Sequence, residues 1–301
     1  MNYKGEIMFK YIVTLLAAAA VSAHAQIVTG AGATFPAPVY SKWASEYNKA
    51  TGVRVNYQAV GSGAGIKQID ARTVDFGATD DPRKSDELAA QKQVQIPVVK
   101  GGVVAVVNVD GVGANELNLS AKQLADIFEG KVKTWKQVDP KLPDTVITRV
   151  VRADASGTTA VFTDYLSRKS QTFRDNVGTA KQISWPLGNV TAGKGNAGVA
   201  AMVQQVKGTI GYVEYAYAKQ GKLASVKLNG VEAGLDTFAN GKYELTAATY
   251  VIFYQQGANA EAVKFFEWAL TSGDKVAQDL DYVPLSAKEK AESVRILKSL
   301  K

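Results

Sequence analysis

Four short segments of the chain combine small residues, hydroxyl side chains and single charges in a pattern that suits binding of a small anion. Their sequences are Gly30-Ala31-Gly32-Ala33-Thr34-Phe35, Gly61-Ser62-Gly63, Thr79-Asp80, and Arg152-Ala153-Asp154-Ala155-Ser156-Gly157-Thr158. A tetrahedral oxyanion taken out of water needs many directed donors, and hydroxyls, backbone amides and one guanidinium supply them without excess charge. Arg152 is the only full positive charge that we place among them. The segments therefore predict an oxyanion cage.

The elements that must position these segments alternate along the chain. Strands are predicted at 27–29, 54–60, 75–79, 101–108, 146–151 and 247–254, with helices in between and a closing helix that carries Val263, Phe266 and Leu270. This alternation is typical of an α/β protein with mainly parallel sheets. Each of the four segments follows a strand and three of them open a helix. Ligands bind at the carboxyl ends of such strands, and helix N-termini suit anions because their first amides are unpaired.

Each segment taken alone also has a simpler interpretation. The hydroxyl residues Thr34, Ser62, Ser156 and Thr158 stand where ordinary helix caps stand. Arg152 and Asp154 can form a structural ion pair. The stripe of Val39, Trp43 and Tyr47 at helical spacing indicates core packing rather than a binding face. Nucleotide binding is disfavoured, because the glycine turns match neither a P-loop nor the full dinucleotide pattern.

Composition excludes several kinds of chemistry. The chain has 301 residues and 46% hydrophobic content, which by the rule of ~150 residues per domain predicts two globular units. It has no cysteine, and its single histidine is His24, so thiol catalysis, disulfides, Ser-His-Asp hydrolysis and histidine-based zinc sites are disfavoured. The formal charge of +7 favours anions. Its basic residues are scattered, without the clustering that nucleic-acid binding requires, so no nucleic-acid partner is expected.

Residues 1–25 are expected to be an export signal. Lys4 and Lys10 precede the short apolar run of residues 11–21, and Ala23-His24-Ala25 supplies the small residues that a signal peptidase needs. We expect cleavage before Gln26, and Met8 is an alternative start that leaves this expectation unchanged. The run is shorter than the ~20 apolar residues that span a bilayer, so the mature protein is expected to be soluble and periplasmic.

A series of short motifs runs along nearly all of the mature chain. The first is Gly30-Ala-Gly-Ala-Thr-Phe-Pro-Ala-Pro-Val-Tyr40. The others are Tyr57-Gln58, Gly61-Ser62, Lys67-Gln68-Ile69, Val74-Asp75-Phe76-Gly77-Ala78, Arg152-Ala153-Asp154, Ser156-Gly157-Thr158, Trp185-Pro186, Gly193-Lys194-Gly195-Asn196, Gly208 to Gln220, and Lys264-Phe265-Phe266. With these motifs the chain closely resembles the phosphate-specific periplasmic binding proteins of bacterial ABC phosphate importers. Motifs combined at this density are highly specific.

This resemblance implies an α/β type II periplasmic-binding-protein fold. Two lobes, each with a central mixed sheet flanked by helices, would enclose the ligand in the cleft between them. We expect residues 26–108 and 246–301 to form a discontinuous first lobe and residues 109–245 to form a second lobe inserted into it. The resemblance assigns phosphate binding to Thr34, Phe35, Ser62, Asp80, Arg152, Ser156, Gly157 and Thr158, here called the cage residues. It also implies that Asp154 orients Arg152.

Asp80 favours phosphate over other oxyanions. A carboxylate beside an anion is hard to justify unless the ligand still carries a proton that the carboxylate can accept, as phosphate does near neutral pH. A receptor for sulfate or molybdate, which carry no such proton, is the first alternative. A secreted phosphatase or esterase is the second, and an adhesive or regulatory surface role is the third.

We expect no catalytic residue, cofactor or metal. Expected partners are phosphate, its analogue arsenate and the membrane permease subunits of an importer, bound by a monomer.

Overall fold

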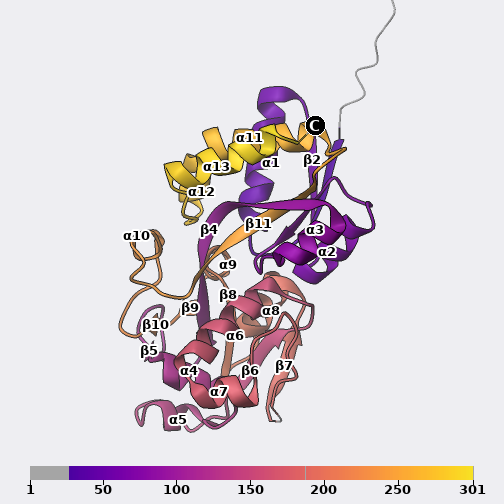
Figure 1. Ribbon diagram of the computed structural model, residues 1–301. Helices are drawn as coiled ribbons and strands as arrows, with labels where there is room; N and C mark the ends of the chain where they lie inside the picture. The colour runs from indigo at the N-terminus through magenta and orange to yellow at the C-terminus, as the bar shows by residue number, and fades with distance from the viewer. Residues whose placement is uncertain (1–26, 187, 301) are drawn as a thin grey trace, which may run out of the picture.

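One long strand joins the two halves of the molecule. The computed structural model describes residues 27–186 and 188–300, and the predicted signal segment lies outside them. Strand β4 (Gln93–Asn108) runs from one half into the other, and β11 (Thr246–Tyr254) runs beside its first part (Figure 1). Residues 93–102 of β4 pair with β11, whereas residues 103–108 pair with β8. We call the part of the fold on the β11 side the first lobe and the part on the β8 side the second lobe.

The first lobe is a mixed sheet covered on both faces. It contains β1 (Ile27–Gly32), α1 (Ala37–Thr51), β2 (Arg54–Ala59), α2 (Ser62–Asp70), β3 (Phe76–Thr79), α3 (Ser85–Gln91) and, after β11, α11 (Ala260–Ser272), α12 (Asp274–Asp279) and α13 (Ala287–Lys298). β1 is parallel to β2 and β3, and β11 is antiparallel to β3. Successive residues of β11 point to opposite faces, so Phe253 packs in the main core while Ile252 packs with Ile69 of α2.

Helix α1 forms as its sequence predicts. Pro36 stands at its N-cap, where a missing amide hydrogen costs nothing, and Gly52 ends it in the left-handed conformation with a φ of 78°. Val39, Trp43 and Tyr47 are all buried, which confirms that this stripe packs in the core.

The second lobe is built on β8, β6 and β7, with helices on both faces. It contains β5 (Asn118–Leu119), α4 (Ala121–Phe128), α5 (Trp135–Val138), β6 (Thr148–Arg152), α6 (Gly157–Lys169), α7 (Gln171–Asn176), β7 (Val190–Gly193), α8 (Gly195–Gln205), β8 (Thr209–Glu214), α9 (Tyr215–Gln220), β9 (Ala224–Ser225), β10 (Lys227–Leu228) and α10 (Leu235–Ala239). Tyr212 of β8 stacks on Phe162 of α6 at a centroid distance of 4.2 Å. The neighbouring Gly211 faces Val199 and Val203 of α8. Both faces of β8 are therefore buried.

Two elements differ from the sequence predictions. β4 begins eight residues before the predicted Gly101, and Pro97 lies inside it opposite an irregularity in the register at Thr249 and Tyr250 of β11. Such irregularities accommodate proline in a sheet, which is why proline did not end the strand. The helix predicted to close the chain is α11, and it is followed by α12 and α13. Ser293 of α13 bonds to the Pro97 carbonyl, so these last helices cover the proline-containing part of β4.

The pairing of β4 changes from β11 to β8 between Gly102 and Val103, a few residues before the predicted lobe boundary at 108. The division into residues 26–108, 109–245 and 246–301 stays a prediction. Within the described residues, no helix is long and apolar enough to cross a membrane.

Candidate oxyanion site

The cage residues lie at the carboxyl ends of strands and at the first turns of helices. Thr34 and Phe35 connect β1 to α1, Ser62 is the first residue of α2, and Asp80 follows β3. In the second lobe Arg152 ends β6. The other three cage residues of the second lobe stand at the start of α6, and they are Ser156, Gly157 and Thr158. All eight cage residues are buried. They come from segments that lie far apart in the sequence.

The cage residues of the two lobes touch each other directly. The hydroxyl oxygen of Ser62 accepts the amide hydrogen of Gly157 at 3.1 Å and that of Asp80 at 3.4 Å. A Cβ atom added to Gly157 would lie 2.6 Å from Ser62 Oγ and 2.8 Å from Asp80 N, so only glycine permits this approach. The structure is therefore closed at this point.

Asn196 connects two further cage hydroxyls. Its backbone and side-chain nitrogens both donate to Thr34 Oγ1, at 3.1 and 2.7 Å, and the side-chain nitrogen also donates to Thr158 Oγ1 at 3.3 Å. A hydroxyl has two acceptor positions and one donor hydrogen. Thr34 accepts two bonds here, as Ser62 does, so the hydrogen of each hydroxyl remains as a donor. Neutral donors of this kind suit an anion.

Ser156 shows that capping and ligand binding are compatible. Its hydroxyl accepts the amide hydrogen of Thr159 at 3.0 Å and so caps α6. The simpler interpretation of this residue as a helix cap is confirmed. Its O–H nevertheless remains a donor at the N-terminus of the helix, where negative charge is favoured.

Arg152 is held by Asp154 in a two-point contact. Nε of Arg152 donates to one carboxylate oxygen at 2.9 Å and Nη2 donates to the other at 2.5 Å, while the amide of Gly195 also donates to Asp154 at 2.9 Å. Burial opposes ionisation of Asp154, but the bonds and charge of Arg152 outweigh it and lower its pKa. Nη1 of Arg152 is buried and has no hydrogen-bond partner among the described residues. A buried guanidinium donor of this kind requires an acceptor.

Asp80 brings a carboxyl group into the same enclosed space. Its Oδ1 accepts a hydrogen bond from Thr249 of β11 at 2.9 Å. Burial raises the pKa of Asp80 to about 7, against the opposing effects of the Thr249 bond and the charge of Arg152. Near neutral pH this carboxyl group can therefore either hold a proton or accept one, which matches a ligand whose own protonation changes in that range.

Sequence reasoning missed Asn196 and Thr249. Asn196 lies within the block Gly193-Lys194-Gly195-Asn196 that carries the resemblance, where Gly195 has a φ of +68°, but no role was assigned to it. Thr249 lies in the predicted strand 247–254, and no sequence signal distinguishes it from an ordinary strand residue. Both are completely buried.

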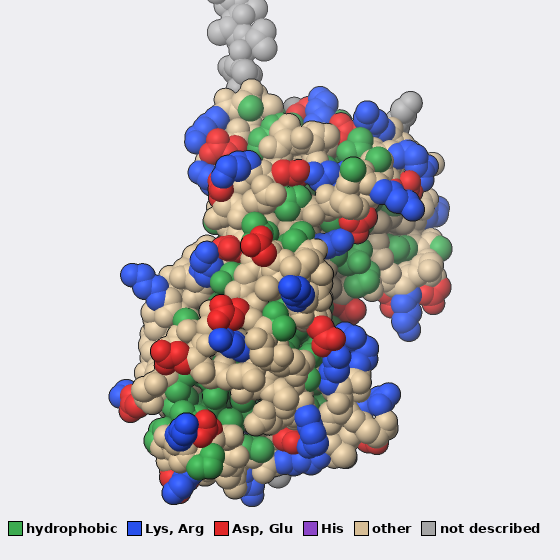
Figure 2. Space-filling view, turned by 90° about the vertical axis from the view of Figure 1, so that its left-hand side faces the viewer, with side chains coloured by type: hydrophobic (Ala, Val, Ile, Leu, Met, Phe, Trp, Pro, Cys, Tyr) green, Lys and Arg blue, Asp and Glu red, His purple; other side chains and the backbone are tan. Residues whose placement is uncertain are grey.

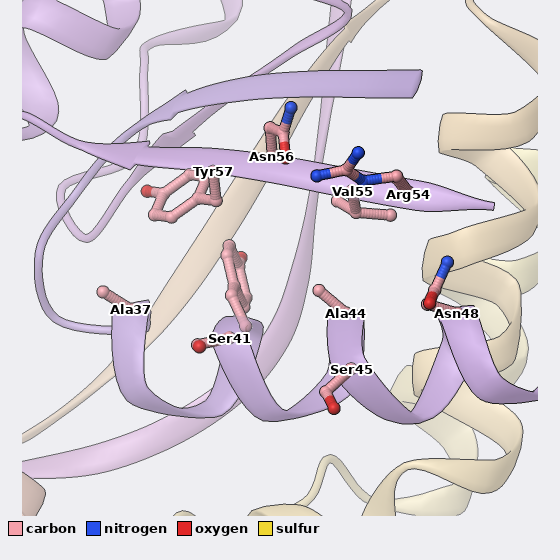
Figure 3. A pocket seen from close by; sticks show the side chains of 10 residues that line it. Ala37, Ser41, Ala44, Ser45, Asn48, Arg54, Val55, Asn56 and Tyr57 are labelled. Atoms are coloured by element: carbon pink, nitrogen blue, oxygen red, sulfur yellow. The ribbon is translucent and has the colours of Figure 1, made fainter. Parts of the chain in front are cut away.

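One surface hollow lies away from the cage. It has a volume of about 520 Å³, lies between α1 and β2 and is lined by residues such as Ser41, Ser45 and Arg54 (Figure 3). A smaller hollow of about 250 Å³ reaches Asp80 between the lobes, with Val161 on one side and Thr246 on the other.

The surface charge is mixed. On the face shown in Figure 2, acidic and basic side chains are interspersed over both lobes. Within the described residues, no group of three or more potential side-chain ligands is placed to hold a metal ion. Neither a nucleic acid nor a metal is needed to account for the buried donors of the cage.

Comparison with known proteins assigns the family. Residues 17–272 match the model of the PBP superfamily domain. The phosphate-binding protein PstS of Pasteurella multocida is 43% identical over 88% of each chain, and that of Haemophilus influenzae is 42% identical over 88% of this chain and 90% of the relative. A putative phosphate ABC transporter substrate-binding protein from Clostridium perfringens, solved with bound phosphate, is 21% identical. It covers 87% of this chain and 100% of its own with a TM-score of 0.74, which confirms the predicted fold class. The chain belongs to the PBP superfamily and, within it, to the family of PstS phosphate-binding proteins.

Proposed function

We propose that this protein binds inorganic phosphate between its two lobes and delivers it to an ABC importer. The observation that carries the proposal is the enclosed cage, in which the partnerless Nη1 of Arg152 and the carboxyl group of Asp80 are buried together with hydroxyl and amide donors from both lobes. The close PstS relatives are named for phosphate binding, which supports the same ligand.

In this proposal phosphate is bound without its water. Arg152 donates charge-assisted bonds, which are stronger than neutral ones. The donors that surround the rest of the ion are Thr34, Phe35, Ser62, Ser156, Gly157 and Thr158. Asp80 accepts a hydrogen bond from the proton that phosphate retains. Sulfate offers only lone pairs to Asp80, which disfavours a sulfate receptor as the alternative function.

Binding is coupled to closure in this proposal, because the cage residues are divided between the first lobe (26–108 and 246–301) and the second (109–245). A ligand shifts such an equilibrium by its greater affinity for the closed form.

We further propose cleavage before Gln26, release into the periplasm as a monomer, and docking on membrane permease subunits. Arsenate, with the same shape and protonation as phosphate, is expected to compete for the site.

We propose no enzymatic activity. Hydrolysis of a phosphate ester needs an activated nucleophile, and the chain offers no cysteine and no histidine other than His24 in the predicted signal. Incubation with a chromogenic phosphate ester is the simple test. Release of the chromophore at a rate that Arg152→Ala abolishes would contradict a pure receptor.

Calorimetric titration tests the binding function. Protein stripped of bound phosphate should bind one phosphate per chain, should bind arsenate at the same site, and should give no measurable heat with sulfate at the same concentrations. A chain that binds sulfate but not phosphate would contradict the proposal.

Replacing Asn196 tests a residue that sequence reasoning missed. Asn196→Ala should weaken phosphate binding by roughly 30-fold, because two cage hydroxyls each lose a side-chain hydrogen bond that contributes about 1 kcal/mol. Asn196→Asp should weaken it more, because it adds a negative charge beside Thr34. The exposed Asn189 provides the control, and Asn189→Ala should bind like the parent in the same titration. Equal affinities for all four proteins would remove Asn196 from the site.

A further inference from the structure

A second buried carboxyl group lies at the contact between the lobes, and the phosphate cage does not use it. Glu214 ends β8 and pairs with Val103, where β4 passes from one lobe to the other. Its side chain is completely buried. Its Oε2 lies 2.8 Å from the hydroxyl oxygen of Tyr282, which follows α12 in the first lobe, and accepts the amide hydrogen of Ala216 at 3.0 Å.

The hydroxyl group of Tyr282 lies between two oxygen atoms. It is 2.6 Å from the carbonyl oxygen of Phe35 and 2.8 Å from Oε2 of Glu214. A phenol has a single hydrogen to donate, and a backbone carbonyl can only accept one. If the phenol donates to Phe35, the second short contact requires a hydrogen from Glu214. Both contacts are therefore satisfied only when the carboxyl group of Glu214 is protonated.

The surroundings of Glu214 favour the protonated form as well. The ionisable groups that act on it are the carboxyl groups of Asp80 and Asp281 and the phenols of Tyr217 and Tyr282, and Asp281 is itself paired with Lys219. Oε1 of Glu214 is buried without a hydrogen-bond partner among the described residues, which is tolerable for a neutral acid and costly for a carboxylate. Burial raises the pKa of Glu214 well above its ordinary value. The charges of Asp80 and Asp281 add to this effect, whereas the hydrogen bonds with the Ala216 amide and with Tyr282 oppose it without reversing it.

The contact also supports the cage. Phe35 belongs to the turn whose amide is a predicted phosphate donor, and its carbonyl is held by Tyr282. The preceding carbonyl, of Thr34, accepts a hydrogen bond from Tyr217 of α9 at 2.6 Å. Tyr217 thus fixes the peptide group that carries the Phe35 amide, and Tyr282 fixes the next peptide group of the same turn. Glu214 contacts Tyr282 and so supports the second of these peptide groups.

We propose that Glu214 is a positioning residue that acts as a neutral acid: in the closed protein its O–H donates a hydrogen bond to the hydroxyl oxygen of Tyr282 and so holds the Thr34–Phe35 turn in place for phosphate. The positioning role rests on the proposed phosphate binding, whereas the proton on Glu214 does not.

Carbon-13 NMR of protein labelled at the glutamate carboxyl carbons tests the proton directly. With phosphate bound, one glutamate should keep the chemical shift of a protonated acid at about pH 7, where an ordinary glutamate, with a pKa of about 4.3, is ionised. That signal should be missing from Glu214→Gln and present in Glu292→Gln, a control at an exposed glutamate paired with Arg295. Ionised shifts for every glutamate in the loaded parent would overturn the proposal.

Phosphate titration of three variants tests the positioning role. Glu214→Ala and Tyr282→Phe should each weaken binding by roughly tenfold, because each breaks one bond of the chain that leads to Phe35. Glu214→Gln should lose clearly less, because its amide is a neutral donor of similar shape. Thermal unfolding of each variant checks that it is folded. An affinity of Glu214→Gln as low as that of Glu214→Ala, or a parental affinity of Glu214→Ala, would contradict the role.

The failure of this inference differs from failure of the phosphate assignment. If the parent bound no phosphate, the proposed function and the positioning role would both be wrong, while the carbon-13 shift of Glu214 would still show whether the acid holds its proton. If the parent bound phosphate and the protonated signal were missing, only the role of Glu214 would fall.

Discussion

Arg152→Ala should weaken phosphate binding by at least about 30-fold, because truncating one partner of a buried charge pair costs about 2–5 kcal/mol and 1.4 kcal/mol is tenfold. The substitution removes the guanidinium that contacts Asp154 and leaves that carboxylate without this partner beside an anion. Thr158→Ala removes one neutral hydroxyl and should cost roughly tenfold or less. Isothermal titration of the parent and both variants with phosphate gives the comparison.

Conservative variants separate charge from geometry at the same position. Arg152→Lys should recover only part of the loss, because an ammonium group cannot bond Asp154 and phosphate through a planar fork. Asp154→Asn should be milder than Arg152→Ala, because the arginine is then loosened but not removed. Parental affinity in all these variants would show that phosphate binds elsewhere.

Asp80→Asn should change selectivity more than affinity. A site built to pair with a substrate hydroxyl can reject an analogue that lacks it by about 10⁴ to 10⁵, so the single acceptor at Asp80 can account for most of the rejection of sulfate. Asparagine removes the negative charge and adds a donor, which relaxes the repulsion of sulfate while phosphate still binds. The measurement is the ratio of the two dissociation constants in the parent and the variant.

The matched control for this experiment is Asp81→Asn. Asp81 is the next residue, is more exposed and pairs with Lys181 at the edge of the cleft. Asp81→Asn changes the formal charge by the same amount but leaves the eight cage residues unchanged. The ratio of its dissociation constants for phosphate and sulfate should therefore stay near that of the parent. If Asp80→Asn left the ratio unchanged, Asp80 would have no part in selectivity. A parent that preferred sulfate would overturn the functional assignment.

Much of the architecture is predictable because its signals are local. The stripe of Val39, Trp43 and Tyr47, with Pro36 before it and Gly52 after it, defines α1 from residues near in sequence. The extent of β4 was underestimated because Pro97 is a local signal against a strand, and only its pairing with β11 overrides that signal. The sequence analysis did not predict the helices after α11. The apolar pattern of α13 is weak, and this helix is stabilised by its packing on β4, which the local sequence does not show.

The site divides in the same way. Thr34, Ser62, Asp80, Arg152 and Ser156 stand at ends of strands or starts of helices, where the four segments taken together suggest an anion site. The resemblance to a known family then assigned a role to each of these residues. Asn196 and Glu214 are different, because their roles depend on side chains that approach from another lobe. Asn196 meets Thr34, which is 162 residues away, and Glu214 meets Tyr282, which is 68 residues away. No pattern along the chain encodes such pairs.

The most direct test of the account is the position of the bound anion in a crystal structure with arsenate, whose arsenic atom can be located by its anomalous scattering. The account predicts one strong anomalous peak between Arg152, Asp80 and Ser62, lost when excess phosphate is added. A peak in the hollow between α1 and β2 that phosphate displaces, with none between the lobes, would contradict it.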